Sequence, residues 1–399
     1  MRKVLSLLCA STIAFGAVSC SEEKQQEKQS IMQTQEITQE WDKVFPKSKN
    51  VNHKKVTFHN RYGITLVADY YSPIDIEEDV QLPAIAVCGP FGAVKEQSSG
   101  LYAMLIAERG YITIAFDPSY TGESSGEPRQ MASPDINTED FIAAVDYLST
   151  LPEVKADCIG IVGICGWGGL ALNAAALDPR IKATVAMTMY DMSKVNAEGY
   201  FGSEDSPEQR MQKRKALAAQ RTEDYKSGIY TLAGGVIDPL PDDAPEFVKD
   251  YHAYYKTIRG YHPRGGNSNE GWNIIGCQSF LNMPLLSYAH EIENPVLLIH
   301  GEKAHSRYFS EYAFEKITGH KPTVATKIVT QDSTNVNTGL WLTEENNVKF
   351  IIVKDASHVD LYDNLDKIPF DLIDQFFNDS FTEEQQEEQL MTSDTINQQ

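Results

Sequence analysis

The sequence predicts an α/β fold in which helices cover both faces of a mainly parallel β-sheet, and three observations support this. Apolar runs suited to buried strands recur along the chain, at residues 83–88, 111–117, 158–162, 182–189, 295–300 and 348–353. Stretches with helical spacing lie between several of these runs, and a glycine-rich strand-to-helix turn follows the third of them. Apolar strands that alternate with helices are typical of a parallel sheet covered on both faces.

The chain before the first buried strand has the pattern of a β-hairpin. Residues 56–60 and 64–71 are strand-like, and 61–63 (Arg-Tyr-Gly) supply the turn between them. A helix is then expected over 101–109, with Gly110 as a glycine C-cap.

The next helix is expected over 141–148, with Asn137 or Thr138 available as its N-cap. An amphipathic helix over 370–377 closes the fold. Between about 196 and 292 the alternation is interrupted by a helix-prone, aromatic-rich insertion. Insertions above the carboxyl ends of sheet strands form lids and substrate pockets, so we expect a lid here.

Cys165 lies in the turn Gly-Ile-Cys-Gly-Trp-Gly-Gly at 163–169, between an apolar run and a helix-like stretch. A strand, a glycine-packed turn and a helix form the nucleophile elbow of α/β-hydrolases, in which a strained backbone exposes the nucleophile. Glycines are needed because the strand and the helix pass too close for a Cβ. The pattern departs from the usual one at Trp167, where a glycine is expected. The alternative is a buried structural cysteine at a tight turn.

The other members of a triad are sought in the order nucleophile, acid, base. His358 follows the last strand, where a base is expected, although a surface or capping histidine is the alternative. An Asp commonly lies three residues after the glycine that ends the preceding strand, and here that place holds Ala304. Glu302 and Asp191 therefore remain as two candidate acids, each at the end of a predicted strand.

The oxyanion hole is expected in the loop at 89–93, together with the amide that follows the nucleophile. Pro90 has no N–H, so the amides of Phe91 and Gly166 are the expected donors. A simple tight turn is the alternative for this loop. The N-terminus of the following helix favours a thiolate, so a lowered pKa is expected for Cys165.

Six segments support a resemblance to a known family: 89–97 (GPFGAVKEQ), 116–124 (FDPSYTGES), 163–166 (GICG), 254–260 (YYKTIRG), 300–307 (HGEKAHSR) and 356–363 (ASHVDLYD). Together they resemble bacterial α/β-hydrolases related to dienelactone hydrolase, over essentially the whole folded chain. The resemblance implies Cys165 and His358 as catalytic residues and leaves the substrate open. Gly89 stands where relatives often carry histidine. Relatives also lack 321–346, whose Thr- and Asn-rich sequence predicts an inserted loop or hairpin.

The N-terminus has the pattern of a lipoprotein signal, with a basic start, a short apolar core and a lipobox-like end at Cys20. Cys20 would be acylated, and the protein would be a periplasmic or outer-membrane or cell-surface lipoprotein. An uncleaved anchor is the alternative. The expected organisation is a signal peptide at 1–20, a flexible tether at 21–50, a hydrolase domain at 51–381 and a disordered tail at 382–399.

The net charge of −21 argues against nucleic-acid binding, which needs a concentrated basic face. The cysteine spacing suggests neither a metal site nor a disulfide framework, and we expect no metal and no cofactor. A small-molecule substrate is expected, and membrane contact only through the N-terminal lipid. The oligomeric state is left open.

Three functions remain open from the sequence. The first is a hydrolase that cleaves an ester, thioester or lactone of a small molecule through a Cys-His-acid site. The second is an acyltransferase on the same scaffold, and the third is a non-catalytic lipoprotein that binds a small molecule or an envelope partner. Lid aromatics either line an acyl pocket or form lid core: Tyr251, Tyr254, Tyr255, Tyr261 and Trp272. Arg259 and Arg264 either bind a substrate carboxylate or face solvent.

Overall fold

The computed structural model of the protein describes residues 39–77, 79–323, 327–330 and 339–382. From Trp41 on, the described residues form one compact unit. The predicted signal peptide, Cys20 and the part of the predicted tail after Thr382 lie outside the described residues. The tether was predicted to reach residue 50, but the folded body already begins at Trp41. Phe45 lies in the hydrophobic core, so this stretch is anchored by burial of an aromatic side chain.

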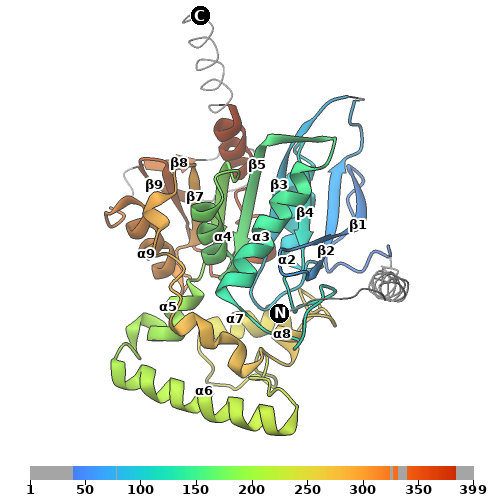
Figure 1. The fold of residues 1–399 in the computed structure, drawn as a ribbon. Helices are drawn as coiled ribbons and strands as arrows, with labels where there is room; N and C mark the ends of the chain where they lie inside the picture. The colour runs from blue at the N-terminus through green and yellow to red at the C-terminus, as the bar shows by residue number, and fades with distance from the viewer. Residues whose placement is uncertain (1–38, 78, 324–326, 331–338, 383–399) are drawn as a thin grey trace, which may run out of the picture. The chain divides into compact units, whose positions relative to one another are not determined.

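The centre of the fold is a ten-stranded sheet in the part of the chain that the structure describes, with the order β1-β2-β4-β3-β5-β6-β7-β10-β9-β8 (Figure 1). Its strands are β1 (Val51–His59), β2 (Thr65–Pro73), β3 (Leu82–Cys88), β4 (Ile112–Phe116), β5 (Val154–Ile164), β6 (Ala183–Met187), β7 (Val296–Gly301), β8 (Lys327–Thr330), β9 (Gly339–Glu345) and β10 (Val348–Val353). The strands from β4 to β10 in this order pair in parallel, and the strands at both edges pair antiparallel. The predicted hairpin and parallel core are confirmed.

The helices outside the lid are α2 (Ser98–Ala107), α3 (Pro134–Ser149), α4 (Gly166–Leu177), α9 (Arg307–Thr318) and α10 (Asp360–Asp363). Residues 370–382 are also helical, which includes the predicted closing helix. The helix predicted over 141–148 starts earlier than expected. Its N-cap is Ser133, whose Oγ accepts from the amide of Ile136, and not Asn137 or Thr138. Both of these lie buried inside the helix, after Pro134 at its first position.

Two glycines of β5 show how closely helices pack on both faces of the sheet. A Cβ at Gly160 would meet the ring of Phe377 in the C-terminal helix. A Cβ at Gly163 would meet Ala171 and the backbone of Trp167 in α4. Residues an odd number apart on a strand point to opposite faces. The C-terminal helix and α4 therefore cover opposite faces of the central strand.

The lid between β6 and β7 is helical, as predicted for about 196–292. Its elements are α5 (Met192–Glu198), η1 (Tyr200–Gly202), α6 (Pro207–Ser227), α7 (Glu246–Tyr255), α8 (Gly266–Asn269), η2 (Ile274–Leu281) and η3 (Ala289–Glu291). Figure 1 shows them gathered beyond the carboxyl ends of the parallel strands. A candidate site at that end of the sheet is therefore covered.

The segment 321–346 contributes two strands, β8 and β9, which pair antiparallel and extend the sheet beyond β10. The hairpin predicted there is present among the residues that the structure describes. None of the helices in the described ranges is long and apolar enough to cross a bilayer.

Candidate active site

Cys165 occupies the sharp turn between β5 and α4, with φ 59° and ψ −125°. A residue with a side chain rarely adopts a positive φ, and such strain persists only where the surroundings impose it. Here the amide of Cys165 donates to Met187 O at 2.9 Å, and its carbonyl accepts from Gly168 at 2.9 Å and from Tyr190 at 2.8 Å. The predicted elbow is confirmed as a backbone geometry, and β6 together with α4 holds it.

The two departures from the usual pattern, Gly89 and Trp167, are in contact. A Cβ at Gly89 would lie 2.9 Å from Cβ of Trp167 and 2.2 Å from Ile164 O. The Trp167 side chain is buried and packs edge-on against Phe116 and Phe141. Glycine in the oxyanion loop thus leaves the space that a large residue at the elbow requires. Gly89 and Trp167 therefore depend on each other for packing.

His358 lies in the loop after β10, as predicted, and is 2% exposed. Its Nδ1 is 2.7 Å from Ser306 Oγ and 2.8 Å from Thr188 Oγ1. Thr188 has φ 42°, a strained value for a β-branched residue, directly after β6. The imidazole is therefore oriented by two hydroxyls.

A second buried histidine continues this chain of contacts. His300 Nε2 is 2.9 Å from Ser306 Oγ, and His300 Nδ1 is 2.7 Å from Ser310 Oγ. One assignment of the protons fits the contacts of Ser306 and Ser310: His358 Nδ1–H donates to Ser306, whose hydroxyl donates to His300 Nε2. His300 Nδ1–H then donates to Ser310. In this assignment His358 Nε2 keeps its lone pair free to accept a proton.

Neither candidate acid reaches His358, so the expected carboxylate of the triad is corrected. Glu302 accepts from the amide of Asp355 at 2.9 Å. Asp191 is the N-cap of α5, where it accepts from the amide of Lys194 at 2.9 Å. The two loops were nevertheless the right ones, because they supply Ser306 and Thr188. These hydroxyls were not predicted because only carboxylates were considered as partners of the base. In the structure each carboxylate accepts from a backbone amide instead, Asp191 from Lys194 and Glu302 from Asp355.

Tyr362 connects the cysteine and the histidine. Its hydroxyl lies 2.9 Å from His358 Nε2 and is also hydrogen-bonded with the Cys165 side chain. Within the described residues, no hydrogen bond joins Cys165 directly to His358. Tyr362 follows His358 by four residues, one helical turn, so a motif search for a base gave no reason to select it.

The backbone amides of Phe91 and Gly166 both hydrogen-bond to the Cys165 sulfur. These are the two donors expected for an oxyanion hole. A Cβ at Gly166 would meet the Phe91 side chain at 2.8 Å, so glycine permits this close approach of the two loops. Two converging amides beside a nucleophile are suited to stabilise an oxygen that becomes negative. Their catalytic role remains a prediction.

Burial governs the protonation of the site. It raises the pKa of the Cys165 thiol, although Tyr362 and the two amides act in the other direction. Burial also lowers the pKa of His358 well below its ordinary value, aided by the neighbouring His300 and His305. The lowered thiol pKa expected from the helix N-terminus is therefore not observed, because desolvation of the thiolate is the larger effect. Thiol and imidazole are both neutral at rest.

Tyrosines surround the thiol on the lid side. Tyr251 and Tyr255 of α7 each have hydroxyls hydrogen-bonded to that of Tyr362. The Tyr190 hydroxyl is 3.1 Å from that of Tyr251 and also contacts His305 Nε2. Two of the lid aromatics named from the sequence thus face the site. The others differ: Tyr254 packs against Tyr362, Trp272 packs against Phe91, and Tyr261 is exposed.

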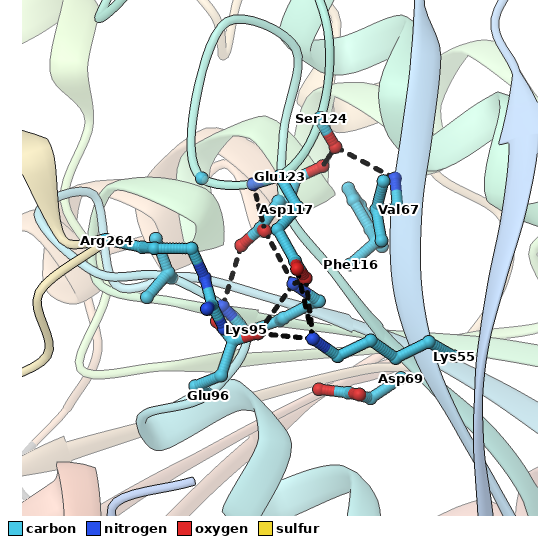
Figure 2. A network of polar contacts seen from close by, with 12 residues as sticks. Lys55, Val67, Asp69, Lys95, Glu96, Phe116, Asp117, Glu123, Ser124 and Arg264 are labelled. Atoms are coloured by element: carbon cyan, nitrogen blue, oxygen red, sulfur yellow. Dashed lines mark hydrogen bonds and ion pairs between the residues drawn. The ribbon is translucent and has the colours of Figure 1, made fainter. Parts of the chain in front are cut away.

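A cluster of charged side chains surrounds Lys95, and we call it the Lys95 cluster; Figure 2 shows most of its members. Its members are Asp42, Lys43, Lys55, Asp69, Lys95, Glu96, Asp117, Glu123 and Arg264. Lys95 is fully buried, with Nζ 2.8 Å from Asp117 and 2.6 Å from Glu96, and its amide donates to Asp117 at 2.8 Å. The cluster fixes the loop that carries the Phe91 amide, four residues before Lys95.

The carboxylates of Glu96, Asp117 and Glu123 lie close enough together to hold a metal ion. The Lys95 ammonium is paired with all three of them, so a cation of the protein itself already occupies that position. The donor set therefore does not fit a metal. Arg264 is paired with Asp42 and Glu96, and Arg259 with Asp363. Both arginines thus hold the lid to the body.

Comparisons with known proteins agree with this fold. The model of the S15 family of X-Pro dipeptidyl-peptidases matches residues 62–330. Uncharacterized protein PA2218 of Pseudomonas aeruginosa is 53% identical over 345 residues, which are 86% of this chain and 85% of that protein. The crystal structure of PA2218 aligns with a TM-score of 0.77 at 52% identity, covering 86% of this chain and 98% of that chain.

Two further relatives are more distant. Uncharacterized protein YcjY of Escherichia coli is 32% identical over 78% of this chain and 93% of that protein. Thiohydrolase aneE of Aspergillus aculeatus is 32% identical over 38% of this chain and 46% of that protein. The predicted α/β-hydrolase fold is confirmed, while the closer grouping with dienelactone hydrolase stays a prediction. The chain belongs to the S15 family of X-Pro dipeptidyl-peptidases and is an α/β-hydrolase enzyme, a hydrolase or an acyltransferase.

Proposed function

We propose that the protein cleaves an ester, thioester or lactone of a small, uncharged molecule through a thioacyl-enzyme at Cys165. The observation that carries this proposal is the set of groups that converge on one sulfur atom. Two backbone amides and a tyrosine linked to His358 all hydrogen-bond to Cys165, which a strained elbow holds in place. A merely structural cysteine requires none of these partners.

The proposed reaction proceeds in two steps. In the first, Cys165 attacks the substrate carbonyl, the thiol proton passes to His358, and the carbonyl oxygen becomes negative. The amides of Phe91 and Gly166 stabilise that charge, and the leaving group departs with a proton from His358. In the second, water attacks the thioester and the same groups act again. His358 is suited to this because its imidazole is neutral and can accept a proton.

The surroundings of the thiol support an uncharged acyl group. The groups around it are tyrosine hydroxyls and neutral histidines, and burial opposes charge at each of them. A charged substrate would meet the same desolvation without a partner of opposite sign. The thiohydrolase aneE is a partial relative, and its name favours thioesters among the three bond types.

Acyl transfer is the second candidate, and the closed lid favours it. Cys165 is 8% exposed and His358 2%, so the acyl-enzyme would be shielded from bulk water. An acyl group shielded in this way survives until a bound acceptor takes it. A partial relative, drtE of Aspergillus calidoustus, is named an acyltransferase.

The test is to trap the acyl-enzyme. The purified protein is mixed with p-nitrophenyl acetate, phenyl thioacetate or Gly-Pro-p-nitroanilide, and the modified residue is identified by mass spectrometry. We expect acylation of Cys165 by the first two compounds, no acylation in Cys165→Ala, and a loss on the order of 10²-fold or more in His358→Ala. Cys277→Ala, which changes a lid cysteine away from the site, is the control and should behave as the wild type.

Two outcomes would change the proposal. Unchanged chromophore release in Cys165→Ala would refute a cysteine nucleophile. Cleavage of the Gly-Pro anilide alone, dependent on Cys165, would make the enzyme a peptidase. An added alcohol or amine that diverts the acyl group from water identifies transfer.

We also propose that the enzyme is a lipoprotein attached through Cys20 on the periplasmic side of a membrane or at the cell surface, because the N-terminal sequence has that pattern. Cys20→Ala should move the protein from the membrane fraction to the soluble fraction. Unchanged retention of this variant in washed membranes would contradict the proposal.

A further inference from the structure

We propose that Tyr362 is a catalytic residue that carries the proton between the Cys165 thiol and the His358 imidazole. The inference rests on the proposed function and adds a third side chain to Cys165 and His358 in its chemistry. Its basis is geometric: one hydroxyl contacts both reacting partners, 2.9 Å from His358 Nε2 and within hydrogen-bonding reach of the sulfur. No comparison and no feature of the sequence assigns this residue a role.

Several contacts hold Tyr362 in this position. Ser98 of α2 donates to the backbone carbonyl of Tyr362 at 2.8 Å. On the lid side, the Tyr254 ring packs edge-on against the Tyr362 ring at 5.1 Å between centroids. The ring is therefore clamped between the helix that follows the oxyanion loop and the lid.

The hydrogen bonds around His358 give the relay its direction. With Nδ1–H donating to Ser306, Nε2 accepts from the Tyr362 hydroxyl, and that hydroxyl can accept from the thiol. As Cys165 attacks a carbonyl, the S–H bond breaks and an S–C bond forms. The thiol proton moves to Tyr362 Oη while the Tyr362 proton moves to His358 Nε2. Tyr362 ends the step as a neutral phenol, and no oxidant or other reactant is needed.

The neutral resting state explains why such a relay is needed. Many cysteine hydrolases start from a thiolate–imidazolium pair, which depends on a lowered thiol pKa. Here burial opposes both charges, and none of the carboxylates in the described part of the chain contacts the far side of His358. The proton must then move during the attack itself, and a bridging hydroxyl allows this without separating charge over a long distance.

The test compares Tyr362→Phe with Tyr102→Phe in the full-length protein. Tyr102 is a matched control, because it is buried next to Tyr362 and its hydroxyl bonds Leu361 O without contacting Cys165 or His358. The rate of acylation of Cys165 by p-nitrophenyl acetate is measured in single turnovers from pH 5 to pH 9. Circular dichroism reports folding of each variant.

We expect the wild type and Tyr102→Phe to acylate at a rate that is nearly independent of pH above pH 7. Tyr362→Phe should be slower by about 10²-fold at pH 7, the usual size of a proton-transfer contribution. Its rate should rise about tenfold per pH unit, because the thiol must now ionise without help. A solvent deuterium isotope effect present in the wild type should be lost in the variant.

Three results would overturn the relay in different ways. A Tyr362→Phe variant with wild-type rate and pH profile would show that His358 takes the proton directly. A faster variant would show that Tyr362 blocks the thiol. In both cases the proposed function stands, because Cys165 is still acylated. If no acyl group forms on Cys165 in the wild type, the proposed function fails and the relay with it.

Discussion

Two polar clusters of the protein, the Lys95 cluster and the group around Cys165, differ in charge. The Lys95 cluster contains four cations and five carboxylates that pair with one another. The group around Cys165 consists of a thiol, histidines and tyrosines, all of them neutral at rest. One group is thus stabilised by paired charges, and the other by the absence of charge.

The difference follows from the number of partners that each group has. In the Lys95 cluster every cation meets at least two carboxylates, and this pairing opposes the cost of desolvation. Around Cys165 no opposite charge is available, so desolvation keeps each group neutral. In the Lys95 cluster the ion pairs hold the side chains in fixed positions. Around Cys165, a neutral thiol and a neutral imidazole can exchange a proton. We infer that the charged cluster positions the oxyanion loop and the neutral group performs the chemistry.

The largest expected effect is the loss of a cation from the charged cluster. Lys95→Met leaves Asp117 and Glu96 buried without their main partner. We expect a loss of about 3–5 kcal/mol in the free energy of unfolding, measured by urea denaturation.

Lys303→Met is the control for this comparison. Lys303 pairs with Asp355 at 2.8 Å, but both side chains are exposed. Removal of this surface pair should leave the urea midpoint close to that of the wild type, because water screens an exposed ion pair. Equal effects in the two variants would show that burial does not distinguish the two kinds of ion pair.

The second effect is the pH dependence of the free energy of unfolding that results from the buried, neutral His300. Burial lowers the pKa of His300 well below its ordinary value, so below about pH 6.5 the unfolded chain binds a proton that the folded protein does not. Stability is therefore lost as the pH falls. His300→Gln should reduce this slope by about 1.4 kcal/mol per pH unit between pH 6 and pH 5, measured from urea midpoints at each pH.

Between pH 6 and pH 5, the buried Asp140 changes the stability in the opposite direction, but it does so equally in the wild type and in the variant. Burial raises the pKa of Asp140 to about 6, so the folded protein binds that proton more readily than the unfolded chain. This contribution is the same in the wild type and in His300→Gln. The exposed His290→Gln serves as the control. A slope unchanged by His300→Gln would mean that His300 is protonated in the folded protein.

The smallest effect tests whether hydroxyls have replaced the acid. Ser306→Ala removes one of the two partners of His358 Nδ1, at a cost of about 1 kcal/mol, which is about fivefold in kcat. Glu302→Gln should leave kcat unchanged, since the carboxylate bonds only a backbone amide among the described residues. Loss of a true triad acid costs up to about 10⁴-fold, so a large effect of Glu302→Gln in ester hydrolysis would contradict the site described here.

The sequence predicted the elements that depend on local pattern. The hairpin, the parallel core strands and the elbow at Cys165 all follow from periodicity and glycine placement, and they are where the pattern placed them. It also located His358 in the right loop. The N-cap of α3 was misplaced, because several polar residues near the start of the helix are equally good caps by composition.

Contacts between distant segments were less predictable. Gly89 and Trp167 were two unrelated departures in the sequence, and they form one packing unit only because the oxyanion loop crosses the elbow. Asp42, in the expected tether, pairs with Arg264 of the lid. Such pairings join residues tens to hundreds of positions apart, and no local pattern records them.

The sequence by itself determined the fold class, the strained position of Cys165 and the loops that approach it, because these depend on backbone preferences and on alternating apolar segments. The tertiary structure alone decided which side chains in those loops meet. Thr188 and Ser306 reach His358, while Asp191 bonds to the nearby amide of Lys194 and Glu302 to the amide of Asp355 in another loop. The charge state was decided there as well, because desolvation depends on everything packed around a group and not on its neighbours in the chain.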